Sequence, residues 1–335
     1  MTIKEIANLA SVSTATVSRV INGKNDVSEH TRETIQRLIH ENSFKPKVSV
    51  VSQNDNIGVF ISDNRTQLSN PYTTIIMSGI ADELFKSEVL VTLIPSNKIS
   101  RNSKEFSIFC AQRRISGCLF LSSTLDDTYI CDLSERVPIV LIGNDLGNSD
   151  VGSVRSDNYE GAYNATQYLI GLGHRNILLV MASPQFIDHR DRLHGAEKAL
   201  ADSGIERHPY DILNSQSLSD SDLNYALSHA FDVNRPEAIF VGGDQDAIRV
   251  IRILSAKGYH IPHDVSVIGY DNLPFSANIN PPLTTVNQPI YEIGREAAKM
   301  VLTIVWDPDF RPRSLILKDN NIMIRESTRR QQIDS

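Results

Sequence analysis

The spacing of hydrophobic positions changes along the chain at about residue 56. In the first 45 residues, apolar side chains recur at helical spacing behind Ser and Thr residues that suit helix N-caps. This pattern predicts three short helices, which open at Thr2, at Ser13 (14–22) and at Ser28 (29–41). The residues expected to close one small core are Ile6, Leu9, Ala10, Val17, Val20, Ile21, Ile35, Leu38 and Ile39.

From residue 57 onward, short apolar runs alternate with longer amphipathic stretches. Such runs are typical of parallel strands buried on both faces, and the intervening stretches are long enough for crossover helices. We therefore predict an α/β core of two doubly wound lobes with parallel sheets, and a ligand site in the cleft between them. The predicted strands contain residues 57–61, 89–94, 117–121, 138–142, 177–181, 238–242 and 265–269.

These two patterns divide the chain into three parts. Residues 1–45 form a helical head and residues 57–330 a core, and the polar segment 46–56 between them, which contains Pro46 and has neither period, is a linker. Residues 1–50 carry seven Lys/Arg and five Asp/Glu, a net charge of +2. Since the whole chain has a net charge of −7, the other 285 residues have a net charge of −9. The net negative charge speaks against a general affinity for polyanions, but it is unevenly placed: an acidic body bears a mildly basic head.

Cysteine usage and hydropathy indicate where the protein works. Cys110, Cys118 and Cys131 are an odd number without CxxC spacing, which argues against a disulfide framework or a zinc site. The first residues hold no apolar run suited to a signal peptide, and no later run approaches the length of a membrane span. We expect a cytoplasmic protein.

The second predicted helix opens with small polar side chains, which suit the major groove of DNA. Its first turn can approach base edges while Val17 and Val20 hold its back to the core, and Arg19 can reach a guanine edge or a phosphate. A plain helical hairpin, in which Ser and Thr serve only as caps, is the alternative on this pattern alone. The candidate DNA-binding residues are Thr2, Ser13, Thr14, Ala15, Thr16, Ser18, Arg19 and Asn22.

The string IKEIANLASVSTATVSRVING, followed by VSEHTRETIQRLIHENSFKP, resembles the DNA-binding head of the lac repressor family of bacterial transcription regulators. The blocks NPYTTIIMSGI, RDRLHGAEKAL, GDQDAI and VSVIGYDNLPFSANINPPLTTVNQP resemble that family's core in the same order. The resemblance implies a small all-α helix-turn-helix head on an α/β two-lobed core like that of periplasmic sugar-binding proteins. It also implies a homodimer on double-stranded operator DNA, most often a repressor, with a small sugar-like effector in the interlobe cleft.

The linker departs from the family pattern. Members commonly have A-x-x-L in a short hinge helix whose Leu enters the minor groove, and this chain has neither that Ala nor that Leu. Val50 or Val51 could supply the apolar wedge, because kinking the minor groove needs bulk rather than one residue type. A plain tether is the equal alternative.

Four candidate effector-binding residues combine the chemistry of ligand recognition with the family blocks. Tyr72 could stack on a ligand ring, Arg192 donate to its oxygens, and Asp271 accept from its hydroxyls or amines. The alternatives are a surface position for Tyr72 and a mutual ion pair between Arg192 and Asp271. Asp244 is a further cleft candidate, although a helix-capping role suits it better.

Other cleft positions carry less signal. Asn144 and Asp145 follow a predicted strand, where a turn role is at least as good an interpretation as a ligand contact. In the region expected to supply a second aromatic, residues 214–222, only Leu218 is apolar, so a two-sided aromatic sandwich is not expected.

Enzyme classes find no support in the motifs. The chain lacks GxSxG, GxxxxGK[ST], HExxH, and GxGxxG after a strand. His189 and His194 lack the spacing of metal ligands on one helical face, and we expect both to face solvent. The sequence therefore predicts a DNA-binding regulator with no metal, no cofactor and no catalytic site; a ligand-capture protein with a vestigial head is the alternative binding class.

Overall fold

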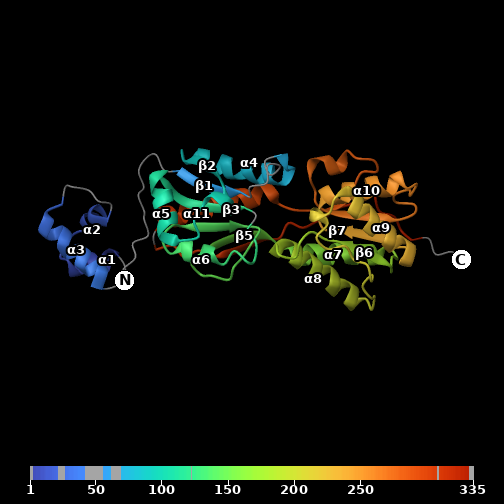
Figure 1. Cartoon of the computed structure of the whole chain (residues 1–335), viewed down its shortest axis with the longest axis horizontal. Coiled ribbons are helices and arrows are strands. Elements are labelled where there is room, and N and C mark those ends of the chain that lie inside the picture. Colours follow the sequence, from blue (N-terminus) through green and yellow to red (C-terminus); the bar gives the residue numbers. More distant parts are fainter. Residues whose placement is uncertain are drawn as a thin grey trace.

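The computed structural model describes residues 3–21, 27–41, 56–61, 69–121, 123–307 and 309–331. The described chain forms a three-helix head and two α/β lobes (Figure 1). The predicted linker residues 46–55, Val50 and Val51 among them, and the candidates Thr2 and Asn22 lie outside these ranges, so the boundaries at residues 45 and 57 stay predictions.

The head consists of α1 (Ile3–Leu9), α2 (Thr14–Ile21) and α3 (Glu29–Glu41). Two predicted N-caps are confirmed: the Ser13 hydroxyl accepts from the Thr16 amide at 3.1 Å, and that of Ser28 from the Thr31 amide at 3.3 Å. A tight turn with Ser11 in the left-handed region (φ 53°) joins α1 to α2. This is the helix-turn-helix arrangement.

Among the predicted core residues whose side chains the structure describes, all but Leu9 pack into the core of the head; the side chain of Ile21 lies outside this description. Ile6, Val17 and Ile35 are fully buried, whereas Leu9 is 58% exposed, and Ala7 is buried instead. The prediction for Leu9 was wrong because the turn after α1 leaves the last residue of this short helix beyond the contact with α2 and α3. Five buried residues suffice to close this core.

The first lobe is built on a six-stranded parallel sheet in the order β10-β5-β4-β3-β1-β2. Helices α4 and α11 cover one face, and α5 and α6 cover the other. Its strands are β1 (Asn56–Ile61), β2 (Leu90–Pro95), β3 (Ile115–Leu121), β4 (Ile139–Ile142), β5 (Gly152–Ser156) and β10 (Ser314–Leu317). Its helices are α4 (Pro71–Lys86), α5 (Ser103–Gln112), α6 (Tyr129–Ser134) and α11 (Ile290–Trp306), with the 3-10 turn η2 (Ser96–Lys98).

The second lobe repeats this plan on the sheet β11-β9-β8-β7-β6, in which only β11 is antiparallel. Helices α9 and α10 cover one face, and α7 and α8 the other. Its strands are β6 (Ile177–Val180), β7 (Ala238–Val241), β8 (Ser266–Asp271), β9 (Thr284–Asn287) and β11 (Ile322–Met323). Its helices are α7 (Asn158–Gly171), α8 (Ile187–Asp202), α9 (Asp220–Asn234) and α10 (Asp244–Ala256), with the 3-10 turns η3 (Ser215–Ser217) and η4 (Pro274–Ala277).

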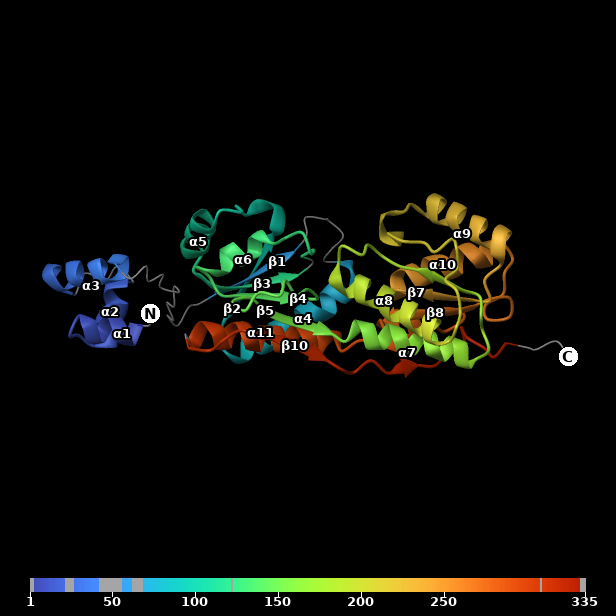
Figure 2. The same ribbon diagram turned by 90° about the horizontal axis from the view of Figure 1, so that it is seen from below.

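The chain passes between the lobes three times, after β5, after β9 and after β10. As a result α11, late in the sequence, lies on the first lobe against α4 (Figure 2). Gly79 and Gly294 make this close crossing possible: a Cβ on Gly79 would meet the Tyr291 carbonyl oxygen at 2.1 Å, and one on Gly294 would meet that of Ile76 at 2.2 Å. Neither glycine can be replaced without separating the two helices.

All seven predicted strands are confirmed, and each end lies within two residues of its predicted position. The prediction that each is buried on both faces was wrong for β2, which lies at the sheet edge and leaves Leu90 and Leu93 exposed. All three cysteines are free, and Cys110 and Cys118 lie in the core.

Candidate functional site

A cavity of about 240 Å³ lies between the two lobes, at the carboxyl ends of the parallel strands. The first lobe lines it with Asn70, Tyr72, Leu121, Ser123, Ile142 and Gly143. The second lobe lines it with Ala182, Phe186, Asp188, His189, Arg192, Gln216, Gly243, Gln245, Asp246, Asp271 and Leu273. Three of the four predicted effector residues, Tyr72, Arg192 and Asp271, are therefore brought together here.

Arg192 is buried on α8 and held from several sides. Its Nε donates to the Asn158 side-chain oxygen at 2.7 Å, and a terminal nitrogen donates to the Gly242 carbonyl. Its Nη2 lies 3.3 Å from a carboxylate oxygen of Asp271, and the guanidinium stacks 3.8 Å from the ring centroid of Tyr270. The mutual ion pair is thus present, and both partners still line the cavity.

Asp271 ends β8 in an uncommon backbone conformation, with φ 111°. Such a conformation is costly for a residue with a Cβ, and it places the carboxylate between Arg192 and the Gln288 amide, which donates to it at 2.7 Å. Burial raises the pKa of Asp271 to about 6 in spite of Arg192. The local strain fixes one charged group at the cavity wall.

Tyr72 stands in the first turn of α4. Asn70 caps this helix, accepting from the Tyr72 amide at 2.9 Å, and Pro71 occupies the first helical position. The Tyr72 ring packs on the first-lobe core and lines the cavity rather than the outer surface. Burial, and then the nearby Asp188 carboxylate, raise the pKa of its hydroxyl.

The sequence did not single out Phe186 and Asp188, and it misplaced His189. Expected in solvent, His189 is half-buried against the cavity, where burial and then Arg192 lower its pKa to about 3; His194 is exposed as expected. Phe186 gives the cavity an aromatic side chain from the second lobe, outside the segment 214–222 that was expected to supply one. That the ligand is not held between two aromatic rings stays a prediction. Phe186, Asp188 and His189 all follow β6. Their position after a parallel strand was the one feature of the sequence that could have indicated a place in the cavity.

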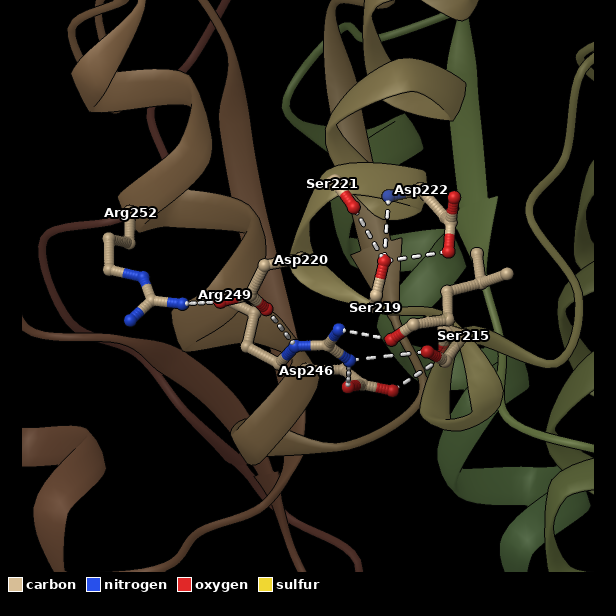
Figure 3. A network of polar contacts seen from close by, with 9 residues as sticks. Ser215, Ser219, Asp220, Ser221, Asp222, Asp246, Arg249 and Arg252 are labelled. Carbon is tan, nitrogen blue, oxygen red and sulfur yellow. Dashed lines mark hydrogen bonds and ion pairs between the residues drawn. The ribbon is translucent and has the colours of Figure 1, made fainter.

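Asp246, which lines the cavity, is held by Arg249 of the same helix (Figure 3). The Arg249 guanidinium donates to Asp246 at 2.8 Å, to the Leu218 carbonyl at 2.6 Å and to Asp220 at 2.9 Å. Since Asp220 lies in the first turn of α9, one arginine ties η3, α9 and α10 together. It also neutralises the charge of Asp246.

The other candidates of the core lie away from the cavity lining. Asp244 is fully buried, and its oxygens accept from the Leu273 amide at 2.8 Å and the Thr285 hydroxyl at 2.6 Å. The predicted capping role was wrong, because Gly243 is the N-cap of α10 and the Asp244 carboxylate bonds to residues outside this helix. Asn144 is buried and donates to Ser123 at 3.0 Å, while Asp145 accepts from the Gly147 amide in a turn. Leu218 packs on the core of the second lobe.

Two direct contacts join the lobes next to the cavity. Arg155 of β5 pairs with Asp191 of α8 at 2.8 Å, and the Leu125 amide donates to the Gln185 carbonyl at 3.0 Å. These contacts hold the lobes together around the cavity.

The N-terminal end of α2 is exposed on the surface of the head. Ser13 and Thr14 are exposed and Thr16 is half-buried, while Val17 and Val20 face the core. Ala15, Ser18 and Arg19 belong to the same helix. A helix with small polar residues in its first turn and an apolar back has the form needed to enter a major groove.

The described residues contain neither a cluster of metal-binding side chains nor a membrane-spanning helix. Within the described ranges, no group of three or more His, Cys, Asp and Glu residues could hold a metal ion. Nor does any helix there have both the length and the apolar character to cross a bilayer.

Comparison with known proteins agrees with both parts of this architecture. Residues 2–47 match the family described as bacterial regulatory proteins, lacI family, and residues 166–328 match a periplasmic binding protein-like domain. The transcriptional regulator CelR of Thermobifida fusca is 32% identical over 97% of this chain and 98% of its own length. Catabolite control protein A of Priestia megaterium is 30% identical over 98% of this chain and 99% of its own.

Solved structures give the same result. A CelR–cellobiose complex is 29% identical, covers 98% of this chain and 99% of its own, and superposes with a TM-score of 0.72. A regulator from Enterococcus faecium with bound ribose is 27% identical, covers 83% of this chain and all of its own, and superposes with a TM-score of 0.71. The predicted fold and the predicted regulatory class are confirmed. This chain belongs to the lacI family of bacterial transcription regulators.

Proposed function

We propose that this protein is a cytoplasmic repressor whose operator affinity changes when a small polyhydroxyl metabolite binds between its lobes. The observation that carries the proposal is the interlobe cavity, in which an arginine, carboxylates, side-chain amides and aromatic rings meet in a space of about 240 Å³. To bind a sugar ring, a site needs charged groups that form two hydrogen bonds each with its hydroxyls, and an aromatic face on which the ring can stack. The cellobiose and ribose bound to two structural relatives support this ligand class.

Within the cavity we assign direct ligand contact to Tyr72, Arg192 and Asp271. The Arg192–Asp271 pair does not exclude contact, because a guanidinium has five N–H groups and Arg192 uses three of them on protein partners. We assign Asp244 a positioning role. It holds the Leu273 amide just beyond Asp271, and so supports the cavity wall without lining it.

DNA recognition falls to the head. We propose that Thr14, Ala15, Thr16, Ser18 and Arg19 face the major groove, and that Ser13, Thr2 and Asn22 contact the backbone or cap the helices that do. A single head reads one half-site, so a near-palindromic operator requires two heads and hence a homodimer. The apolar side chains that α4 and β2 leave exposed, Phe85, Leu90 and Leu93, supply a surface for such pairing.

The proposal is tested by selecting duplexes from a random-sequence pool with the full-length protein. We expect near-palindromic sequences to be enriched, with an affinity that falls as salt rises. Arg19→Ala should weaken binding to the selected duplex by about 1–3 kcal/mol, whereas Arg37→Ala, which removes one charge from an exposed position on α3, should cost less. If no sequence is enriched over the starting pool, the protein is not an operator-binding regulator.

A further inference from the structure

The acidic residues around the cavity are not equally compensated. Asp271 has Arg192 as its partner, and Asp246 has Arg249. Asp188, which also lines the cavity, has no ion-pair partner among the described residues. Of the three carboxylates in the described cavity lining, it is the one without an ion-pair partner in the described chain.

Asp188 is nine-tenths buried in the first turn of α8. One of its oxygens accepts from the Asn158 side-chain nitrogen at 2.7 Å. Its other oxygen has no hydrogen-bond donor in the described chain, and it reaches toward the first lobe, where a Cβ placed on Gly143 would lie 2.7 Å from it. A carboxylate oxygen that is free to accept a hydrogen bond therefore points into the space between the lobes.

The charged groups facing Asp188 come from four elements, and none of them forms an ion pair with it among the described residues. Arg192, on its own helix, is paired with Asp271, and Arg155 of β5 is paired with Asp191. Burial dominates over these arginines and raises the pKa of Asp188 to about 7. The further titratable neighbours, Asp191 and Asp271, Tyr72 of α4, and His189 with its lowered pKa, supply no positive charge.

A neutral hydroxyl and a cationic amine would satisfy this oxygen differently. A hydroxyl would donate one hydrogen bond but would supply no positive charge to the ionised form of this buried carboxyl group, which stays unfavourable in a closed site. An ammonium group supplies donors and the missing positive charge together. We infer that the ligand of this cavity is a single-ring polyhydroxyl compound with a primary amine, such as an amino sugar, and that Asp188 selects it by binding the ammonium group.

The cavity volume limits the size of such a ligand. About 240 Å³ is below the roughly 300–1,000 Å³ of sites for drug-sized molecules, so it favours one ring over two. This inference rests on the proposed function for the position of the ligand, and it adds the charge of the ligand.

The test measures binding of paired sugars to the full-length protein by titration calorimetry at pH 7. Glucosamine, galactosamine and mannosamine are each compared with the parent hexose and with the N-acetyl derivative, which keeps the shape and removes the charge. We expect at least one hexosamine to bind about tenfold or more tightly than both of its counterparts. If no hexosamine is preferred, or none binds, the inference is wrong.

Variants then assign the preference to one side chain. Asp188→Asn should bring hexosamine and hexose to equal affinity, whereas Asp202→Asn, the same change at the exposed end of α8, should keep the preference. A preference that persists in Asp188→Asn overturns the role of this residue. Should that variant fail to fold, titration of the wild type in two buffers of different ionisation enthalpy decides, because ammonium binding to a partly protonated Asp188 must release protons and a binding event without release contradicts the inference.

The outcomes also separate this inference from the proposed function. Binding of neutral hexoses without hexosamine preference removes the ammonium site and leaves an effector-controlled regulator intact. Failure of the duplex selection removes the regulator and does not bear on the charge of the ligand.

Discussion

The two lobes contribute different chemistry to the cavity they share. The first lobe supplies an aromatic ring, aliphatic side chains, two hydroxyls, one amide and a glycine, while every Asp, Arg and His of the described lining belongs to the second lobe. The charged contacts that we propose for the ligand therefore come from the second lobe.

The strongest way to break this asymmetry is to remove Arg192, at the centre of the charged wall. Arg192→Met leaves Asp271 buried without its cation and Asn158 and the Gly242 carbonyl without a donor. We expect the free energy of unfolding to fall by about 3–5 kcal/mol, measured by urea denaturation. Arg252→Met, at an exposed ion pair of the same lobe, is the control and should cost about 0–1 kcal/mol. If both variants lost the same free energy of unfolding, Arg192 would contribute no more to stability than an exposed arginine.

The second prediction uses the pH dependence of the same wall. An unfolded chain releases the Asp188 proton near pH 3.8, whereas the folded protein holds it up to about pH 7. The folded state binds more protons between these values, so this group stabilises the fold at low pH and its contribution is lost as pH rises through 7. Asp188→Asn should therefore reduce the loss of stability between pH 5 and pH 8 by about 2–3 kcal/mol, measured by denaturation at both values. An unchanged pH dependence would show that Asp188 titrates normally.

The smallest expected effect concerns the ion pair that connects the two lobes beside the cavity. Arg155→Ala removes the ion pair with Asp191, whose side chains are 17% and 18% exposed, and should cost about 0.5–1 kcal/mol of stability. Because this pair joins the lobes, we also expect a larger radius of gyration in small-angle scattering and weaker ligand binding. Arg313→Ala, at an exposed position of the first lobe, should change neither. An unchanged radius in Arg155→Ala would mean that the pair does not hold the lobes closed.

Sequence periodicity predicted the buried strands and failed for the marginal ones. Runs such as those of β1 and β3 are apolar on both faces because helices cover both sides of the sheet, and that pattern is visible without a structure. In contrast, β5 and β9 contain Ser, Thr and Arg, and β11 has two residues. Their strand conformation depends on the neighbours with which they pair, which a local pattern does not contain.

The site was predictable where one side chain carries the chemistry, and not where two lobes combine to make it. Tyr72, Arg192 and Asp271 combine fitting side chains with positions in family blocks. Asp188 and His189 sit in the first turn of α8, and whether that turn meets solvent or a cavity depends on the first lobe facing it. That contact joins residues far apart in sequence.

The triple passage of the chain between the lobes has a consequence for synthesis. The first lobe needs α11 to cover Ile76 and Ile80 and β10 to complete its sheet, and these elements follow nearly all of the second lobe. A ribosome must therefore translate past residue 317 before the first lobe can close its core. A chain that stops earlier would display a bare aliphatic face, the feature that chaperones and proteases detect, so incomplete copies would be removed before they could pair with intact ones.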